Sequence, residues 1–364
     1  MKAAMIYPNR ESEKAISGYA LTLTTNIRKS QVDIEDVTYT AGKPLTLFNQ
    51  LSKIRNFDSI HIQHEYNLLG KYGLPFFWTY LYLGLFKKNK LITTMHTVLS
   101  QKENFKGSII KTIARKVLYF FQNRIINWTS DVIVVHANFF KDILIKEYGV
   151  KASKIEVIPQ GIIEDVPNIN KEKAKKKFNL SGPVYIIMGG FVPDHGADII
   201  IKRADKIGAT VLIVANPTPV NDRNKERTES FLNQNQDYVK NNKLDKFVRF
   251  DISDITDKKP EWWEYFAASD LVLLSYRGGI GSGIFAHAMA AGKPVIASDI
   301  QFFREISQNF DCVKIAKDDD EYPKIIHDAM KKSNYQKMKK GCEKYLKMYG
   351  LSVIAKKYKD IYLK

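Results

Sequence analysis

The sequence predicts an α/β protein with two Rossmann-like, doubly wound domains. Three observations support this prediction. At 364 residues the chain is too long for one ordinary α/β domain and about right for two. Apolar, β-branched runs alternate with longer amphipathic stretches, which is the pattern of βαβ units winding a mostly parallel sheet. A stretch rich in proline and glycine interrupts this alternation near the middle of the chain.

The apolar runs fall into two series, and each run ends on a polar or turn residue. The first series comprises Ala3–Tyr7, Ser59–Gln63, Leu91–Met95 and Val132–Val135. The second comprises Val184–Met188, Thr210–Ala215, Phe247–Phe250, Leu271–Ser275 and Pro294–Ala297. Since ligands of open α/β sheets bind beyond the carboxyl ends of the strands, we expect two such domains to face each other across a central cleft.

The domain boundaries follow from breaks in this periodicity. The segment from Ile158 to Asn168 holds two prolines and a glycine and is expected to be the hinge. We predict an N-terminal, acceptor-side domain at residues 1–165 and a C-terminal, donor-binding domain at 166–334. Residues 335–364 alternate lysines with apolar side chains and predict a C-terminal helix that packs across both domains.

Composition indicates a cytoplasmic protein. Cys312 and Cys342 follow no metal-ligand or redox spacing, and so few thiols in a chain of this size suggest a reducing compartment. The N-terminus runs directly into a strand-like segment and lacks the layout of a signal peptide. The longest apolar stretch, Leu74–Phe86, has 13 residues, whereas a membrane-spanning helix needs about 20.

The net charge of +17 predicts an anionic partner, unless the lysines are simply solvated. Five lysines fall within Lys171–Lys177 and eleven within Lys331–Lys364. No nucleic-acid-binding signature is present, so we favour an anionic membrane surface, met peripherally on its inner face. The aromatic run Phe76–Tyr82 and the basic segment Lys111–Phe121 could dock on a bilayer, or could be buried helices with snorkelling lysines.

A glycine-rich loop lies in the segment Asp270–Asp299, which predicts strand, loop, short helix and strand. The helix should begin at Ser282, a residue type that caps helices, so that free amides and the helix dipole face the loop. Glycines let a ligand approach the backbone, and four fall within six residues: Gly278, Gly279, Gly281 and Gly283. This pattern predicts a diphosphate cradle; the alternative is a turn that merely needs glycine.

The same segment resembles the donor-site signature of the retaining glycosyltransferases of family four, which ends in an Ala-Met-Ala-x-Gly-x-Pro-Val-Ile run. Here that run is Ala288–Ile296. Five further stretches resemble segments of this family in the same order: Ile16–Leu21, Ile60–Glu65, Thr93–Ser100, Val132–Leu144 and Lys154–Ile162. The resemblance covers nearly the whole chain and implies the GT-B architecture of two Rossmann-like domains.

The resemblance also implies contacts for individual residues. It places Gly18 near the donor phosphates and His96 on the acceptor side, at a strand end facing the reacting sugar. Asp251 lies in a segment, Phe250–Asp254, expected near the nucleotide base. His64 and Glu65 are weaker candidates for the acceptor side, His61 is expected to be structural, and His136 could lie in the core or the cleft.

The chain departs from the family pattern at four charged positions. The family usually has an arginine and a lysine that hold the donor diphosphate, and the corresponding positions here are Gly190 and His195. Its paired glutamates correspond to Gly279 and His287. We still expect a donor contact at His287, one turn into the helix.

Transfer with retention, as the resemblance implies, needs neither an enzyme nucleophile nor a metal, so the protein must position substrates and stabilise the departing phosphate. We hypothesise that Arg277 and His195 replace the missing cations, because an imidazole titrates near pH 6.5 and can carry charge. The amides at Gly281, Ser282 and Gly283 remain available whatever the side chains are. No metal is expected, because the histidines fall singly on different strand ends.

The sequence therefore predicts a glycosyltransferase that moves a hexosyl group from a UDP- or GDP-linked sugar, a substrate rather than a cofactor, to a glycan or lipid-linked acceptor. Surface polysaccharide or glycoconjugate synthesis is the expected setting. The alternative is a catalytically degenerate GT-B protein that serves as a binding or scaffold partner of another transferase. A sugar-nucleotide epimerase or a phosphorylase is possible on fold alone, but the residues that either would need have no convincing match.

Overall fold

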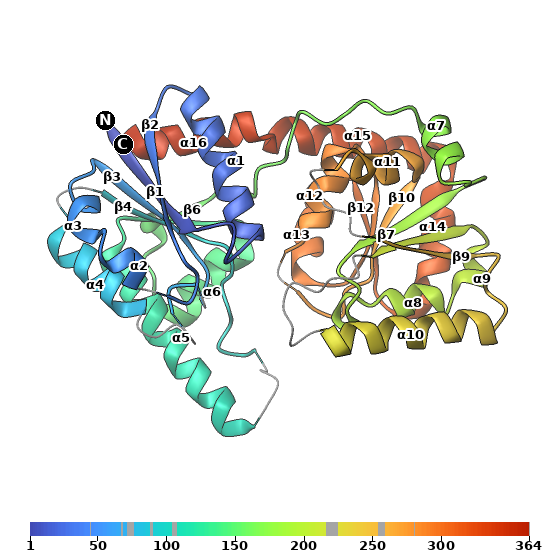
Figure 1. Cartoon of the computed structure of the whole chain (residues 1–364), viewed down its shortest axis with the longest axis horizontal. Helices are drawn as coiled ribbons and strands as arrows, with labels where there is room; N and C mark the ends of the chain where they lie inside the picture. The colour runs from blue at the N-terminus through green and yellow to red at the C-terminus, as the bar shows by residue number, and fades with distance from the viewer. Residues whose placement is uncertain are drawn as a thin grey trace. The chain divides into compact units, whose positions relative to one another are not determined.

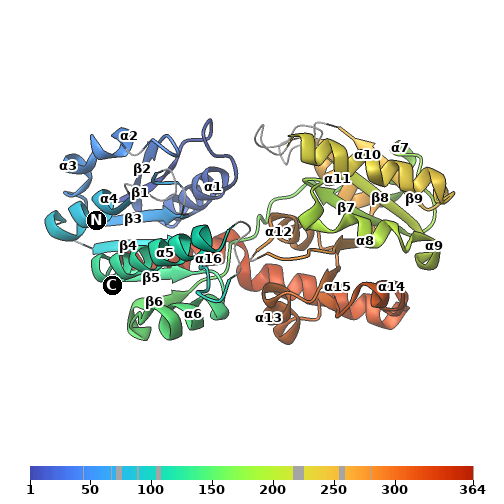
Figure 2. The same cartoon turned by 90° about the horizontal axis from the view of Figure 1, so that it is seen from below.

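The computed structural model of the chain contains two compact units, each built on one six-stranded sheet (Figures 1 and 2). It describes residues 1–43, 45–66, 68–70, 76–87, 90–103, 108–215, 225–253, 259–279 and 281–363. Unit 1 comprises Met1–Gly161 together with Leu351–Lys364, and unit 2 comprises Ile162–Gly350. Every pair of neighbouring strands in both sheets is parallel.

The sheet of unit 1 has the strand order β2-β1-β3-β4-β5-β6. Its central strands are buried on both faces, and β1 and β5 appear in the sequence as apolar runs, whereas β3 alternates isoleucine with buried polar residues. The strands are β1 (Lys2–Pro8), β2 (Asp33–Tyr39), β3 (Ser59–His64), β4 (Lys90–Met95), β5 (Val132–Val135) and β6 (Ile155–Val157).

The helices of unit 1 cover both faces of this sheet. In the sequence they are α1 (Ala15–Lys29), α2 (Leu45–Phe48), α3 (Leu51–Ile54), α4 (Phe76–Phe86), α5 (Ile109–Thr129), α6 (Asn138–Tyr148), the short 3₁₀ helix η1 (Ala152–Lys154) and α16 (Leu351–Leu363). Helix α16 lies beside α1 although the whole of unit 2 separates them in the sequence (Figure 1). The last helix is thus part of the core of the first unit.

The sheet of unit 2 has the order β12-β11-β10-β7-β8-β9. Its strands are β7 (Val184–Gly189), β8 (Thr210–Ala215), β9 (Val248–Ile252), β10 (Leu271–Leu274), β11 (Val295–Ser298) and β12 (Val313–Ala316). The order reverses between β7 and β10: the connections from β7 lead toward β9, whereas those from β10 lead toward β12. This is the topological switch point at which ligands of such sheets bind.

Unit 2 has two hydrophobic cores, one on each face of its sheet. Alternate residues of β7 divide between them: Ile186 belongs to one core, with α11, α12, α13 and α15, and Ile187 to the other, with α8, α9, α10 and α14. The helical elements are α7 (Lys171–Lys177), η2 (Pro193–His195), α8 (Ala197–Ile201), α9 (Ala204–Ile207), α10 (Lys225–Asn241), α11 (Pro260–Ala268), α12 (Gly283–Ala290), α13 (Gln301–Asn309), η4 (Asp319–Glu321), α14 (Tyr322–Met330) and α15 (Lys332–Tyr349).

All nine predicted strands are present, with ends within two residues of the prediction. Three strands that were not predicted, β2, β6 and β12, are edge strands of their sheets. Edge strands are half exposed: β2 has the sequence Asp-Ile-Glu-Asp-Val-Thr-Tyr, and β6 has only three residues. The α/β prediction is confirmed, and what it omitted are the strands without a continuous apolar signature.

The apolar stretch predicted from Leu74 to Phe86 forms helix α4 from Phe76 onward, and Leu74 and Pro75 lie outside the described residues. None of the described helices is both long and apolar enough to cross a membrane. Cys312 and Cys342 are buried free thiols in unit 2.

Candidate functional site

The candidate site of unit 2 is formed by the loops that follow β7 and β10 at the switch point. Gly196 joins them. Its backbone has φ +65°, and a Cβ on it would lie 1.9 Å from the carbonyl oxygen of Ser275. The Ser275 hydroxyl donates to the Gly196 carbonyl at 2.8 Å. Only glycine fits here, so the end of β10 fixes the position of the loop after β7.

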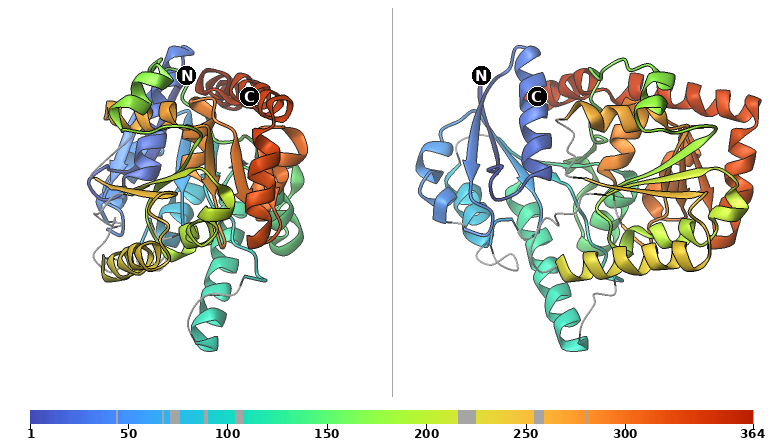
Figure 3. Two further views of the ribbon diagram at one scale, coloured as in Figure 1. Left: turned by 90° about the vertical axis from the view of Figure 1, so that its right-hand side faces the viewer. Right: turned by 45° about the vertical axis from the view of Figure 1, so that its right-hand side comes forward.

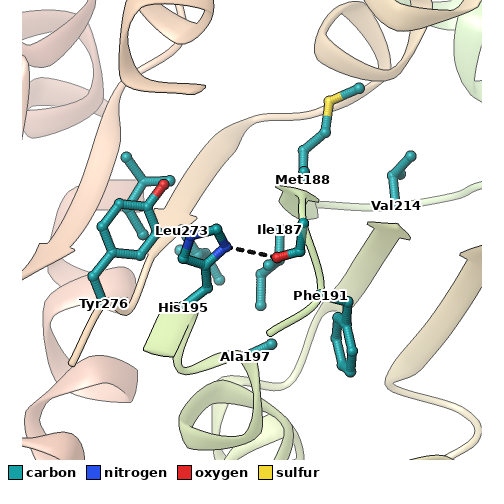
Figure 4. A pocket seen from close by; sticks show the side chains of 11 residues that line it. Ile187, Met188, Phe191, His195, Ala197, Val214, Leu273 and Tyr276 are labelled. Carbon is teal, nitrogen blue, oxygen red and sulfur yellow. Dashed lines mark hydrogen bonds between the residues drawn. The ribbon is translucent and has the colours of Figure 1, made fainter. Parts of the chain in front are cut away.

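His195 lies at the centre of these loops (Figure 4). Its Nδ1 is 2.6 Å from the carbonyl oxygen of Gly190, which must accept, so Nδ1 carries a proton. Its ring stacks on Tyr276 with the centroids 4.9 Å apart. Both rings line a small pocket whose other lining residues are Ile187, Met188, Gly189, Gly190, Phe191, Ala197, Val214, Leu273 and Leu274. Because Nδ1 is engaged, Nε2 is the nitrogen with which His195 can address a ligand.

The N-terminus of α12 adjoins His195 through Tyr276, whose hydroxyl is 2.9 Å from the Ser282 hydroxyl. Ser282 caps the helix as predicted, because its hydroxyl accepts from the Phe285 amide at 3.1 Å. No acidic residue lies in the first turn. A Cβ on Gly281 or Gly283 would meet nothing within 4 Å. The packing of the protein therefore does not require glycine at either position, whereas a ligand lying close to the backbone would.

Arg277 is bound within the protein. Its guanidinium donates to both carboxylate oxygens of Asp198, at 2.8 and 2.7 Å, and to the Pro193 carbonyl at 2.5 Å. Burial raises the pKa of the Asp198 carboxyl, but pairing with Arg277 outweighs it and leaves that pKa below its usual value. The Arg277 amide also donates to the Asp194 carbonyl at 2.9 Å. In this state, Arg277 fastens the loop after β10 to the loop that carries His195.

Asp251 and His287, the other two predicted donor contacts in unit 2, are not among the residues that line this pocket. Asp251 accepts from the Tyr265 hydroxyl at 2.5 Å and from the Ser253 hydroxyl at 3.2 Å. His287 lies edge-on to Trp262 and Trp263 of α11, with centroid distances of 5.2 and 5.5 Å. Asp254, at the end of the segment predicted near the base, is outside the described residues.

The order of strands in unit 1 also reverses, between β1 and β3, and Gly18 lies in the first turn of α1, just after β1. A Cβ on Gly18 would meet nothing within 4 Å. The amides of this turn are occupied, however: the Glu13 carboxylate accepts from Ala15 at 2.9 Å, Ile16 at 2.7 Å and Ser17 at 3.0 Å. Sequence analysis missed Glu13, which lies outside the stretch that resembles the family.

His96 directly follows β4, and His136 directly follows β5. Their last strand residues pair in register, so the two rings meet: His96 Nδ1 is 3.4 Å from His136 Nε2. His136 Nδ1 donates to the Ile158 carbonyl at 2.9 Å. His136 was left open as core or cleft by the sequence. Two histidines that each follow a predicted parallel strand were the signal that could have paired it with His96.

The hydrogen bonds of this pair define a tautomer. Burial lowers the pKa of His136, and burial followed by the neighbouring His136 lowers the pKa of His96 well below the ordinary value, so both rings are neutral near pH 7. The Gln63 amide nitrogen donates to Met5 Sδ at 3.1 Å, and its Oε1 lies 2.8 Å from His96 Nε2 and must accept, so His96 carries its proton on Nε2. With His136 Nδ1 protonated, the facing nitrogens, His96 Nδ1 and His136 Nε2, are both unprotonated, and their separation of 3.4 Å is a contact rather than a hydrogen bond.

His61 and His64 lie in strand β3 and have no exposed surface. His61 Nδ1 is 2.5 Å from the Tyr362 hydroxyl of α16, and its Nε2 is 2.7 Å from the Thr94 hydroxyl. Burial lowers the pKa of each histidine to about 3. His61 is thus held by the C-terminal helix, and His64 packs edge-on against Tyr66 and Tyr80. Among the described residues, no group of three or more His, Cys, Asp or Glu side chains is arranged to hold a metal ion.

Two parallel α/β sheets, each with a loop and helix N-terminus at its switch point, define the GT-B class, and solved structures share this fold over the whole chain. Sucrose-phosphate synthase from Thermosynechococcus elongatus matches with a TM-score of 0.74 at 15% identity, covering 100% of this chain and 98% of that one. HepE from Anabaena, solved with UDP, matches with a TM-score of 0.72 at 14% identity, covering 99% of both chains. Such identities show the fold alone.

Sequence comparison identifies the family. Residues 33–166 match the model described as Glycosyltransferase Family 4, and residues 168–346 match Glycosyl transferases group 1. The chain belongs to this glycosyltransferase family. Among curated proteins, mannosylfructose-phosphate synthase of Agrobacterium fabrum is 26% identical over 230 residues, 59% of this chain. The match spans 46% of the length of that relative.

Proposed function

We propose that the chain is a retaining glycosyltransferase that moves a hexosyl group from a UDP- or GDP-linked sugar to a glycan or lipid-linked acceptor. Synthesis of a cell-surface polysaccharide or glycoconjugate is the setting that we favour. The observation that carries this proposal is the N-terminus of α12 beside His195, where the first turn holds no acidic residue and two glycines border open space. Family membership supports it, as does the binding of UDP and UDP-glucose by the structural relative HepE.

In this proposal the donor diphosphate lies against the backbone at Gly281, Ser282 and Gly283. Helix first-turn amides have no partner within the helix, and with the helix dipole they favour an anion. When its ring is protonated, His195 would donate from Nε2 to the diphosphate and add a positive charge near these amides. Gly190 accepts from the other ring nitrogen and keeps Nε2 available. Asp251 and His287 remain proposed contacts for the rest of the nucleotide.

His96 is the proposed contact on the acceptor side, in unit 1. In its neutral tautomer, Nε2 donates a hydrogen bond, which the Gln63 amide oxygen accepts in the structure at 2.8 Å. A sugar hydroxyl that displaces Gln63 would accept from the same donor. Gly18 is the proposed contact for donor phosphates in this unit.

A specific observation favours a second candidate, a non-catalytic GT-B protein that binds a partner. The two family cations are replaced by Gly190 and His195, and the guanidinium of Arg277 is engaged by Asp198 and Pro193. Removing one donor that stabilises a developing charge costs about 10²–10³ in rate. His195 and the α12 amides must together do what two cations usually do.

The deciding experiment is a binding and hydrolysis screen of the purified chain against UDP- and GDP-linked hexoses. We expect one donor to raise the melting temperature and to be hydrolysed slowly. The variant His195→Ala should weaken donor binding about tenfold, the value of one charge-assisted hydrogen bond. His327→Ala is the matched control, because His327 also bonds a backbone carbonyl in unit 2, at 3.0 Å from Ile207. Binding without turnover would support the non-catalytic candidate, and no binding to any nucleotide sugar would contradict the transferase.

A further inference from the structure

Helix α5 of unit 1 has an inverted distribution of side chains. Its buried residues include the polar Gln122, Asn123 and Thr129. Most of its exposed residues are large and apolar, and Ile109 and Ile110 are 79% and 80% exposed. The complete set of exposed large apolar side chains on α5 is Ile109, Ile110, Ile113, Val117, Phe120, Phe121 and Trp128. A surface helix in contact with water has the opposite arrangement.

These seven side chains form one stripe. With about 3.6 residues per turn, they fall within roughly one third of the circumference of the helix, opposite Tyr119 and Ile126. The buried side of α5 is held by specific contacts, including a hydrogen bond of 3.1 Å from the Tyr66 hydroxyl to Asn123. The stripe is therefore fixed in its outward orientation. The first turns of α5 extend beyond the sheet of unit 1, in teal in Figures 1 and 3.

Exposed apolar side chains continue on the neighbouring helices. Helix α4 packs along α5 and exposes Trp78, Leu85 and Phe86, and Phe48 of α2 touches the Trp78 ring with centroids 6.3 Å apart. Patches of this kind mark interaction surfaces, because isolated soluble proteins rarely leave contiguous large side chains in water. We refer to the seven exposed apolar side chains of α5, together with Trp78, Leu85 and Phe86 of α4, as the apolar stripe.

The charges around the stripe indicate its partner. Helices α4 and α5 contain no aspartate or glutamate, whereas α5 carries Lys111, Arg115, Lys116 and Arg124. Lys116 lies at the edge of the stripe and Arg124 within it, so in a symmetric pair of chains joined through the stripe these two cations would face the same two of the second copy, with no carboxylate on either helix to pair with. An anionic lipid surface presents the complementary arrangement: acyl chains for the apolar side chains and headgroups for the cations.

We infer that the apolar stripe of α4 and α5 is a docking surface for an anionic lipid bilayer, on which α5 lies with Ile110, Phe121 and Trp128 inserted below the headgroups. These side chains, rather than any described helix that crosses the bilayer, hold unit 1 at the membrane. The inference does not depend on donor chemistry. It would place the chain where a lipid-linked acceptor is available, and in that respect it deepens the proposed function.

The test is partitioning of the whole chain between buffer and vesicles, without a nucleotide sugar. Vesicles of phosphatidylcholine alone are compared with vesicles that also contain phosphatidylglycerol. We expect binding to the anionic vesicles at low salt and weaker binding as salt rises. Failure to bind would leave glycosyl transfer untouched, so the two proposals can fail separately.

Substitutions then localise the contact. Ile110→Ser and Phe121→Ser should each lower partitioning by about tenfold, because each removes a large apolar side chain from the bilayer. Leu363→Ser is the matched control: Leu363 is 61% exposed, also in unit 1, but lies on α16. Lys116→Glu, at the edge of the stripe, should lower binding to anionic vesicles and leave binding to neutral vesicles unchanged. Equal melting temperatures of these variants would verify that each is folded.

Tryptophan fluorescence gives an independent measurement. Trp78 and Trp128 are 56% and 59% exposed in unit 1, whereas Trp262 and Trp263 of unit 2 are buried. Lipids brominated in their acyl chains should quench the parent chain more strongly than the variant Trp128→Phe. The inference is overturned if the parent does not bind anionic vesicles, or if Ile110→Ser and Phe121→Ser bind as the parent does. Self-association that these variants abolish, without vesicle binding, would assign the stripe to a second copy instead.

Discussion

The first turns of α1 in unit 1 and α12 in unit 2 lie at comparable places and differ in what their amides bind. Each follows a strand at a switch point, where a helix N-terminus attracts anions. At α1, the Glu13 carboxylate already accepts from three amides. At α12, the neutral Ser282 hydroxyl takes one amide, and the first turn contains no acidic residue.

This difference shows how the carboxyl ends of the strands in two similar sheets can have different functions. The carboxyl ends of the strands in unit 1 are filled by the protein's own groups: a carboxylate at α1 and neutral histidines at the ends of β3, β4 and β5. The corresponding ends in unit 2 have a half-exposed imidazole and glycines beside open space. An anionic ligand would therefore have to compete with the Glu13 carboxylate in unit 1, whereas the amides at the start of α12 in unit 2 are accessible to it.

The largest effect that we expect comes from Gly196→Ala, which would disrupt the loops of the candidate site in unit 2. A Cβ at this position would collide with the Ser275 carbonyl, so the loops after β7 and β10 must separate. We expect a loss of at least about 3 kcal/mol in the free energy of unfolding, together with loss of donor binding. Gly208→Ala is the control, since Gly208 has a similar φ of +69° with nothing within 4 Å.

For that control we expect a loss of only about 1–2 kcal/mol, the cost of the left-handed conformation itself. Urea unfolding measures both variants. Equal losses would mean that the contact with Ser275 does not hold the loops together.

The next effect concerns pH and tests the neutral state of the buried histidines of unit 1. Burial lowers the pKa of His61 and His64 to about 3, whereas an unfolded histidine titrates near 6.5. Below pH 6.5 the unfolded chain therefore binds protons that the folded chain does not. Stability is complete above pH 6.5 and falls as the pH drops toward 3, by up to about 1.4 kcal/mol per pH unit for each such histidine.

Urea unfolding between pH 8 and pH 5 measures this slope. His64→Phe keeps an aromatic ring between Tyr66 and Tyr80 and should make the slope shallower. A parent chain whose stability does not change from pH 7 to pH 5 would contradict the neutral, buried state of these rings.

Ser282→Ala probes the cradle of α12 more gently. Loss of the cap should lower stability by about 1 kcal/mol and weaken donor binding, because the first turn of the helix frays where the diphosphate would lie. Ser108→Ala is the matched control, since Ser108 caps α5 by the same bond to the amide three residues on. It should lower stability similarly and leave donor affinity intact; if both variants bind donor equally, the diphosphate does not lie on α12.

The smallest effect is expected for Glu13→Gln, which sharpens the comparison from the side of α1. If the donor phosphates approach Gly18, removal of the negative charge from this turn should tighten donor binding about two- to fivefold, the value of one charge at a helix terminus. Titration of the donor into parent and variant measures the change. Unchanged affinity would show that the donor does not reach α1.

The sequence was informative where a single stretch determines the structure. Central strands such as β5 and β10 are recognisable because both faces are buried, and the Ser282 cap depends only on residues three apart. Edge strand β2 mixes acidic and apolar residues, and its pairing with β1 provides a signal that no local pattern contains.

Features that depend on distant partners were not predictable. Arg277 was expected to meet a phosphate, and nothing near it in the sequence indicates Asp198, which is 79 residues away. Tyr276 was not singled out, although its ring stacks on His195. The tautomer of His96 depends on Gln63 of strand β3, which is 33 residues away in the sequence.

The return of α16 to unit 1 has a consequence for biosynthesis. A ribosome releases the strands of unit 1 first, but the hydroxyls of Tyr358 and Tyr362, which bond Thr94 and His61, emerge only after all of unit 2. Unit 2 is one uninterrupted segment and can fold as it leaves the ribosome, since domains generally fold as units. Unit 1 must wait, with His61 lacking the hydroxyl of Tyr362, so the half of the molecule that is translated first is completed last.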